Sequence, residues 1–247
     1  SFKNSAKTML TNVIGTANVL EAIKNDKNVK CLIIITTDKV YQNYKFKKYF
    51  DENSVLGGDD VYSGSKACCE ILANSYKKSF FSNRNCRIAT VRAGNCFGGG
   101  DWTKDRIVKD SLQSFFNNKV LVIRNPNATR PWQHVLEPLT GYLMVAEKLF
   151  NEGPSGSDSW NFGPYYRDIK AVSHVAEIFC QAWGESLSWS VEPQSKFYEA
   201  QNLSLDIGKA EKTLGWRPKW TLSEAIDRTV ECSGKIKIKN RALFDQK

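Results

Sequence analysis

Apolar positions in the first ninety residues switch between two spacings. From Asn4 to Asn25 they recur every three or four residues, the period of a helix with one core-facing side. Lys30 to Thr36 is a short β-branched run without polar alternation, which is typical of a strand covered on both faces in a parallel sheet. Asp60 to Phe81 has the helical period again, and Cys86 to Val91 is predicted to be a second buried strand. The order helix, strand, helix, strand predicts an α/β fold with part of a doubly wound parallel sheet.

Polar groups suited to acid–base chemistry stand directly after the first predicted strand. The stretch "CLIIITTDKVY" is apolar until it reaches four polar residues, Thr36, Thr37, Asp38 and Lys39. Open parallel sheets bind their ligands beyond the carboxyl ends of the strands, where loops and helix N-termini converge. These four residues are therefore candidates for a site at the end of the strand.

The next predicted helix carries a tyrosine and a lysine one turn apart. In "YSGSK", Tyr62 and Lys66 are separated by four residues and so share one helical face. A lysine charge favours the phenolate form of a tyrosine, which would let Tyr62 accept and return a hydroxyl proton. Oxidation and re-reduction of a sugar alcohol need such a group. A surface Tyr/Lys pair is the alternative for this motif alone, and the Thr-Asp pair after the preceding strand favours the catalytic interpretation.

Composition narrows the class of protein. The 247 residues are 41% hydrophobic, enough for the core of one large or two small domains. The net charge of +9 is spread out, with small clusters only at Tyr44 to Lys48 and Lys235 to Lys239, and no nucleic-acid motif accompanies them. No apolar run is long enough for a membrane span and the first residues lack a signal-peptide core, so we expect a cytoplasmic protein. Seven scattered cysteines and two histidines predict reduced thiols and no metal.

Several longer motifs, taken together, resemble one enzyme family. "TTDKVY", "YSGSK" and "VRAGNCFGGGDWTKDRIVKD" (Val91 to Asp110) resemble the extended short-chain dehydrogenases/reductases that act on nucleotide sugars. "IRNPNATRPWQHVLEPLTGYLMVAEKL" (Ile123 to Leu149) narrows the resemblance to the CDP-glucose 4,6-dehydratases. The likeness runs from about Asn4 to Cys232, including "WNFGP" and "LGWRPKWTLSEAI".

The resemblance implies a lyase reaction with NAD. Such enzymes oxidise the sugar at C4, eliminate water from C5 and C6, and return the hydride to C6, so CDP-glucose becomes CDP-4-keto-6-deoxyglucose. By position, Thr37 hydrogen-bonds the 4-hydroxyl, Tyr62 is the base at C4, Lys66 holds the nicotinamide ribose, and Asp38 protonates the departing 6-hydroxyl. Lys39 stands where most nucleotide-sugar dehydratases have a glutamate base. It either removes the C5 proton as neutral lysine or stabilises the enolate by its charge.

Substrate contacts are expected from the later part of the chain. Arginine grips a diphosphate bidentately, which makes Arg106 and Arg130 candidates. Asn95 matches the family's substrate-loop asparagine, Trp102 is placed to border the sugar or base, and His134 is either structural or in contact with substrate. Two other tryptophans, Trp132 and Trp160, are more simply explained as core residues.

The cofactor site implied by the resemblance is incomplete in this sequence. Thr36, Tyr62 and Lys66 are expected to contact NAD, but no strand, G-x-x-G-x-x-G loop and helix precedes them. We therefore expect a fragment or truncated product, with part of a Rossmann-like domain in residues 1–94, rejoined by helix 135–150 and strand 158–163. Residues 95–247 are expected to form mainly a smaller mixed α/β nucleotide-sugar domain. Uncovered apolar strand faces would favour low stability or self-association.

Alternatives to this function remain open. One is another nucleotide-sugar dehydratase or an epimerase, although an epimerase has no need of Asp38 as an acid. Another is a remnant that binds sugar nucleotide or a partner without turnover, for which the absent glycine loop is the best argument. The resemblance also implies a homodimer, paired through helix 60–81. Its candidate contacts are Cys68, Cys69, Leu72 and Tyr76, and their packing inside the monomer is the alternative.

Overall fold

The computed structural model describes the chain in two compact units. It describes residues 4–42, 49–82, 84, 86–101, 106–152, 158–184, 187–192 and 204–239, without the side chains of 152 and 234–239. Unit 1 comprises Ser1–Gly94, Pro138–Gly163 and Leu203–Arg217, and unit 2 comprises Asn95–Glu137, Pro164–Asn202 and Pro218–Lys247. The candidate Trp102 and the basic cluster from Tyr44 to Lys48 lie outside the described residues, as do the side chains of Lys235 to Lys239.

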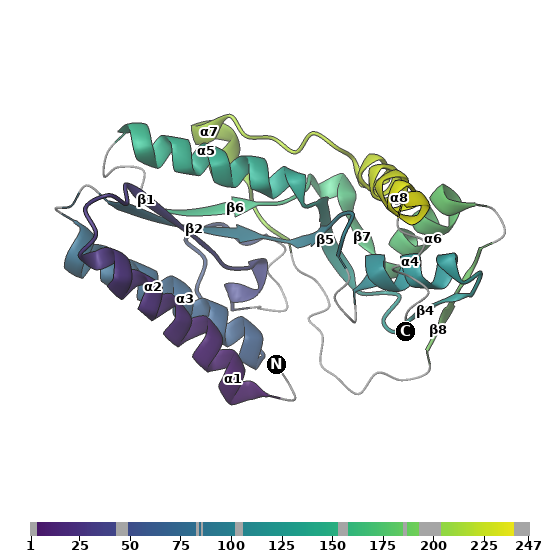
Figure 1. Cartoon of the computed structure of the whole chain (residues 1–247), viewed down its shortest axis with the longest axis horizontal. Helices are drawn as coiled ribbons and strands as arrows, with labels where there is room; N and C mark the ends of the chain where they lie inside the picture. Colours follow the sequence, from purple (N-terminus) through teal and green to yellow (C-terminus); the bar gives the residue numbers. More distant parts are fainter. Residues whose placement is uncertain are drawn as a thin grey trace. The chain divides into compact units, whose positions relative to one another are not determined.

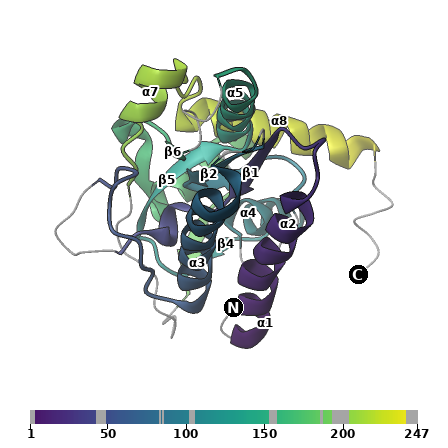
Figure 2. The same ribbon diagram turned by 90° about the vertical axis from the view of Figure 1, so that its left-hand side faces the viewer.

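Unit 1 is a layered α/β structure. Its described elements are α1 (Ser5–Met9), η1 (Leu10–Ile14), α2 (Gly15–Lys24), β1 (Cys31–Ile35), η2 (Asp38–Val40), α3 (Val61–Tyr76), η3 (Lys77–Phe81), β2 (Arg87–Ala93), nearly all of α5 (Leu136–Glu152), β6 (Ser159–Phe162) and α7 (Gly208–Leu214). The strands form a parallel sheet in the order β1-β2-β6. The helices α1, α2 and α3 cover one face of this sheet, and α5 and α7 lie on the other (Figures 1 and 2).

The sheet of unit 1 has one fully buried strand. In β2 every residue after Arg87 is buried, and β2 pairs with β1 on one side, Ile33 opposite Ala89, and with β6 on the other, Val91 opposite Trp160. A central strand of an α/β/α layer structure has no solvent-facing side, which explains why most of its buried residues are apolar.

The expectation that the first strand is covered on both faces is wrong for this structure. Residues Cys31 to Ile34 are only partly buried, and the side chain of Ile35 is 52% exposed. Among the described residues, β1 pairs with β2 alone and therefore lies at an edge of the sheet. The apolar run indicates a strand that is suited to burial, but it does not indicate how many neighbouring strands and helices cover that strand.

Helix α3 begins at a well-formed cap. The carboxylate of Asp60 accepts hydrogen bonds from the backbone N–H groups of Tyr62 and Ser63, at 2.8 and 3.2 Å. An aspartate at this position satisfies N–H groups that have no partner within the helix. The chain enters the helix through Gly58, whose φ of +112° favours glycine. This local chemistry places Tyr62 in the first turn of α3.

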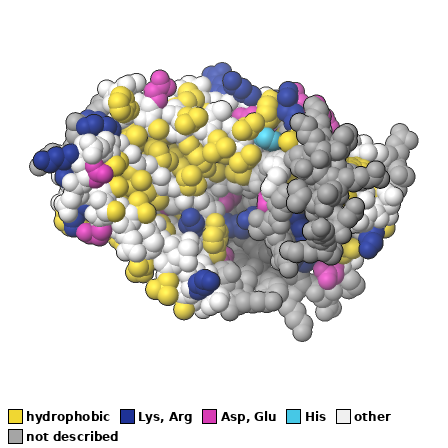
Figure 3. All heavy atoms as spheres, viewed as in Figure 1, with side chains coloured by type: hydrophobic (Ala, Val, Ile, Leu, Met, Phe, Trp, Pro, Cys, Tyr) yellow, Lys and Arg dark blue, Asp and Glu magenta, His cyan; other side chains and the backbone are white. Residues whose placement is uncertain are grey.

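Apolar side chains also gather on the surface of unit 1. Leu143 and Phe150 of α5 are 72% and 63% exposed, and Ile35 lies at the end of the neighbouring edge strand. Figure 3 shows hydrophobic side chains concentrated over α5 and the sheet beside it. Within the described part of the chain, no helix has the length and hydropathy needed to cross a bilayer.

The described part of unit 2 combines short strands with helices. Its elements are β3 (Asn95–Phe97), α4 (Ile107–Phe116), β4 (Leu121–Ile123), β5 (Thr129–His134), η5 (Tyr166–Asp168), β7 (Ile169–Ala171), α6 (Val172–Trp183), β8 (Trp189–Val191) and α8 (Leu222–Lys239). One sheet has the order β3-β5-β7, and β4 pairs with β8. The apolar sides of α4, α6 and α8 meet in a core with Phe97, Trp132 and Phe179. Trp132, and Trp160 in unit 1, are both buried, as core packing predicts.

Candidate active site

The turn after β1 carries the first group of predicted catalytic residues. Thr37 is the N-cap of the 3-10 turn η2, and its hydroxyl accepts from the backbone N–H of Lys39 at 3.4 Å. The same hydroxyl donates to Oδ1 of Asp38 at 3.0 Å. Thr36, Thr37 and Asp38 are buried, whereas Lys39 is half-buried. Strand, cap and turn together hold an acid and a base within three consecutive residues.

The second group lies on α3, which packs against this turn. The ammonium Nζ of Lys66 donates to the backbone carbonyl of Ile35, the last residue of β1, at 3.1 Å. Tyr62 is one helical turn before Lys66, and both side chains are half-buried. Unit 1 therefore brings the five predicted catalytic residues and Thr36 to one place, the carboxyl end of β1.

Three of the predicted substrate residues lie on neighbouring strands of unit 2. Asn95 begins β3 opposite Trp132 of β5, and Phe97 is opposite His134. Arg130 is buried on β5, where its Nη1 donates to the carbonyl of Thr129 at 2.8 Å. Arg106 is exposed and lies away from these strands, at the N-cap of α4. The roles of these residues stay predictions.

His134 has the environment of a packed, neutral histidine. Only 8% of its surface is exposed, and its ring meets the rings of Trp220 and Phe97 edge-on, with centroids 4.9 and 6.2 Å apart. Its Nδ1 accepts from the backbone N–H of Leu136 at 3.2 Å. Burial, together with the nearby charge of Arg228, lowers the pKa of His134 below its ordinary value. These contacts support a structural role beside the predicted substrate role.

A buried ion pair behind the candidate site was not anticipated from the sequence. Glu70 of α3 and Arg92 of β2 are 3% and 2% exposed, and Nη2 of Arg92 lies 2.8 Å from Oε2 of Glu70. Two features of the sequence could have indicated this ion pair. Glu70 follows Tyr62 and Lys66 at four-residue intervals on the same helical face, and Arg92 interrupts an otherwise apolar strand. Charged residues are rarely buried unless they are paired.

The four residues proposed as dimer contacts differ in their exposure. The thiol of Cys69 is buried and donates to the carbonyl of Asn12, while the Tyr76 hydroxyl donates to Glu21 at 2.7 Å. Leu72 packs against the core beside α2, and Cys68 is exposed. In the described chain no group of three or more histidine, cysteine or acidic side chains could hold a metal ion.

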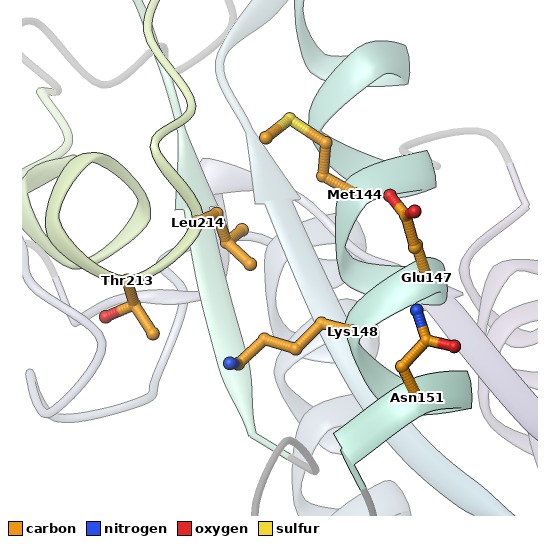
Figure 4. A pocket seen from close by; sticks show the side chains of 6 residues that line it. All are labelled: Met144, Glu147, Lys148, Asn151, Thr213 and Leu214. Atoms are coloured by element: carbon orange, nitrogen blue, oxygen red, sulfur yellow. The ribbon is translucent and has the colours of Figure 1, made fainter.

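One small groove lies away from the candidate site, between α5 and α7. Its volume is about 210 Å³, and it is lined by Met144, Glu147, Lys148, Asn151, Thr213 and Leu214. Figure 4 shows the side chains of Met144 and Lys148 extending from α5 toward α7. Because α5 and α3 cover opposite faces of the sheet, this groove is separate from Tyr62 and Lys66.

Solved structures confirm the fold class. The chain superposes on UDP-glucose 4-epimerase from Thermotoga maritima with a TM-score of 0.82 at 20% identity, over 95% of this chain and 72% of that one. For the dTDP-glucose 4,6-dehydratase DesIV from Streptomyces venezuelae the TM-score is 0.79 at 20% identity, over 99% and 71%. The structure is thus a Rossmann-like α/β fold with a parallel sheet.

The sequence comparison identifies the family. Residues 1–229 match the GDP-mannose 4,6 dehydratase family, and the chain belongs to it. The sequence is 44% identical to CDP-glucose 4,6-dehydratase of Salmonella typhimurium over 94% of this chain and 66% of that protein. It is 27% identical to the human dTDP-D-glucose 4,6-dehydratase over 94% and 64%. The chain therefore spans about two thirds of the length of these relatives, and the family expected from the motifs is confirmed.

Proposed function

We propose that this protein is a lyase that converts CDP-glucose to CDP-4-keto-6-deoxyglucose and water. The observation that carries the proposal is the packing of the turn with Thr37, Asp38 and Lys39 against the helix with Tyr62 and Lys66. The 44% identity to a CDP-glucose 4,6-dehydratase supports the choice of substrate. Asp38 favours a dehydratase over an epimerase, because only dehydration requires an acid for the departing 6-hydroxyl.

The residues at the end of β1 fit the nicotinamide half of NAD. Lys66 is anchored at Ile35, so its ammonium stands at the carboxyl end of the strand, where cofactors bind in this class of sheet. Thr36, Tyr62 and Lys66 would hold the nicotinamide ribose. The sequence contains no G-x-x-G-x-x-G run for the pyrophosphate. NAD, when bound, supplies the hydride acceptor for C4 and the hydride donor for C6.

Each side chain then has a defined task. Thr37 hydrogen-bonds the oxygen at C4, and Tyr62 takes the proton of the 4-hydroxyl as oxidation proceeds. Oxidation acidifies the proton at C5. Lys39 either removes this proton or stabilises the resulting enolate by its positive charge. Asp38 donates a proton to the departing 6-hydroxyl, so one water leaves. General acid or base assistance is typically worth about 10²- to 10⁴-fold.

The test is mass spectrometry of three nucleotide sugars after incubation with the protein and NAD. CDP-, UDP- and dTDP-glucose are compared, with the chain alone and with a fusion that adds a strand, a G-x-x-G-x-x-G loop and a helix before residue 1. Loss of one water from CDP-glucose alone is the expected result. Conversion to an epimer of unchanged mass, separated from the substrate by chromatography, would identify an epimerase. No change with either protein would refute the proposed activity and favour the non-enzymatic remnant.

Three variants assign the steps. Asp38→Asn should lower water loss by about 10²- to 10⁴-fold, and Tyr62→Phe should slow oxidation at C4 by a similar factor. Lys39→Glu distinguishes the two roles of the lysine. Retained turnover would show a base that glutamate can replace, and lost turnover would favour stabilisation by positive charge. Undiminished elimination by Asp38→Asn would contradict the acid role.

We also propose a cytoplasmic homodimer that supplies deoxysugar for a surface polysaccharide. Exposed apolar residues on η1 and α3 support self-association, since Leu10, Ile14 and Ile71 are 61%, 49% and 56% exposed. Light scattering of the purified protein tests the dimer. A monomeric mass at micromolar concentration would contradict it.

A further inference from the structure

We propose that the buried ion pair between Glu70 and Arg92 is a positioning device. It holds the catalytic turn, residues 37–40, and the catalytic helix α3 in one fixed arrangement. The inference rests on the proposed function, since it assigns a role to residues behind the same site. Both side chains are almost fully buried. Their burial keeps them out of reach of a substrate, so they are positioning residues rather than catalytic ones.

The carboxylate of Glu70 is saturated with hydrogen bonds. Its Oε1 accepts from the hydroxyl of Thr36 at 2.5 Å and from Nε of Arg92 at 2.9 Å. Its Oε2 accepts from the hydroxyl of Thr90 at 2.6 Å and from Nη2 of Arg92 at 2.8 Å. The bidentate guanidinium fixes both the position and the plane of this carboxylate, and the two hydroxyls complete its set of four donors.

The guanidinium of Arg92 extends the network to the other side of the turn. Its Nη1 donates to the hydroxyl of Tyr41 at 2.7 Å, and its Nη2 donates to Oγ of Ser159 at 3.0 Å. The Tyr41 hydroxyl in turn donates to Oδ1 of Asn161 at 2.7 Å. Tyr41 is 1% exposed and its ring stacks on Phe50, so this hydroxyl has no route to a substrate.

The ion pair thereby ties down both ends of the catalytic turn. Thr36 precedes the turn and bonds to Glu70, while Tyr41 follows the turn and bonds to Arg92. Glu70 is also on the helix of Tyr62 and Lys66, one turn beyond the lysine. One pair of charges therefore connects the turn that carries the acid with the helix that carries the C4 base.

An ion pair suits this task better than an apolar contact. Buried pairs often add little to stability compared with well-packed hydrophobic residues, but they demand one particular geometry. Burial alone would raise the pKa of Glu70, yet the hydrogen bonds and charge of Arg92, with those from Thr36 and Thr90, hold it below the ordinary value. Glu70 therefore stays ionised and keeps its four donors.

The test compares two variants that each remove one hydroxyl from the network. Tyr41→Phe removes the hydrogen bond between Arg92 and the end of the turn. Thr90→Val removes another buried hydroxyl, which bonds to Glu70 from the middle of β2. The measured quantity is the ratio of two products by mass spectrometry. These are CDP-4-keto-glucose, two hydrogens lighter than the substrate, and CDP-4-keto-6-deoxyglucose, one water lighter.

This ratio does not depend on how much of the protein is folded, so a merely structural role would not change it. A misplacement of about 1 Å can cost about 10²-fold in rate. In Tyr41→Phe we expect elimination to slow relative to oxidation, so that the oxidised, undehydrated sugar increases about 10- to 100-fold. Thr90→Val should keep the wild-type ratio. An unchanged ratio in Tyr41→Phe, or the same change in both variants, would overturn the inference.

A second measurement separates this inference from the proposed function. If the wild-type protein dehydrates no nucleotide sugar, the proposed function fails and hydrogen exchange decides the inference. Amides of Lys39, Val40 and Tyr41 should then exchange at least about tenfold faster in Tyr41→Phe, because opening this turn is a local event. Thr90→Val should leave them unchanged. Equal exchange in the two variants would overturn the positioning role.

Discussion

Replacing Glu70 by glutamine removes one charge from the buried pair and changes little in volume. The amide oxygen of the introduced glutamine could still accept from Thr36 and from Nε of Arg92. Its amide nitrogen would then face Nη2 of Arg92. Two donors would oppose each other where Nη2 now donates to the carboxylate oxygen Oε2 at 2.8 Å. The guanidinium, 2% exposed, would keep its charge without a carboxylate.

The expected loss of stability follows from that uncompensated charge. Breaking a buried pair by removing one partner typically costs about 3–5 kcal/mol, because the remaining ion is desolvated. A folded domain has only about 5–15 kcal/mol of net stability. We therefore expect Glu70→Gln to weaken unit 1 severely, and Glu70→Gln with Arg92→Met to be less destabilised than the sum of the two single changes.

Hydrogen exchange is the appropriate assay, because an unfolding curve of a chain with two compact units mixes two transitions. Amides of β1 and β2 report on unit 1, and amides of β5 serve as the internal reference in unit 2. Glu21→Gln is the matched control, since it makes the same change in the solvent-exposed pair with Lys24 and should alter protection little. Similar protection in both variants, or strictly additive single changes, would refute the reasoning.

Three further predictions concern pH and packing. Because the folded pKa of Glu70 lies below its ordinary value of 4.5, the ionised carboxylate stabilises unit 1 fully above pH 4.5. Protection factors of the β2 amides should fall as the pH drops below 4.5, and they should fall less in Glu70→Gln. Burial also lowers the pKa of His134, so the neutral imidazole stabilises unit 2 fully above pH 6.5. Protection factors of the β5 amides should fall as the pH drops below 6.5, and His134→Gln should make them less dependent on pH. Gly141→Ala would place a Cβ 2.2 Å from the buried ring of Phe162, and hydrogen exchange of the β1 and β2 amides should show a loss of about 1–3 kcal/mol in unit 1. Gly15→Ala, with nothing within 4 Å, should instead gain about 0.5–1 kcal/mol, and equal effects of the two alanines would contradict the packing argument.

The local pattern of the sequence was sufficient for the elements and for the catalytic motifs. Helical period and the Asp60 cap determine where Tyr62 and Lys66 lie on α3, and the polar end of an apolar run determines where Thr37 and Asp38 follow β1. These features depend on neighbours within a few residues, which sequence reports directly. The long motifs added the family, which the comparisons confirm.

The environment of each element depended on the tertiary structure. The apolar run of β1 suits burial, yet its exposure is set by which strands pair with it, and β1 pairs with β2 alone in the described chain. The convergence of Glu70, Arg92 and Tyr41 joins residues 22 to 51 positions apart, which no local period encodes. Sequence determines which side chains a face presents, whereas only packing decides what covers that face and which buried charges meet there.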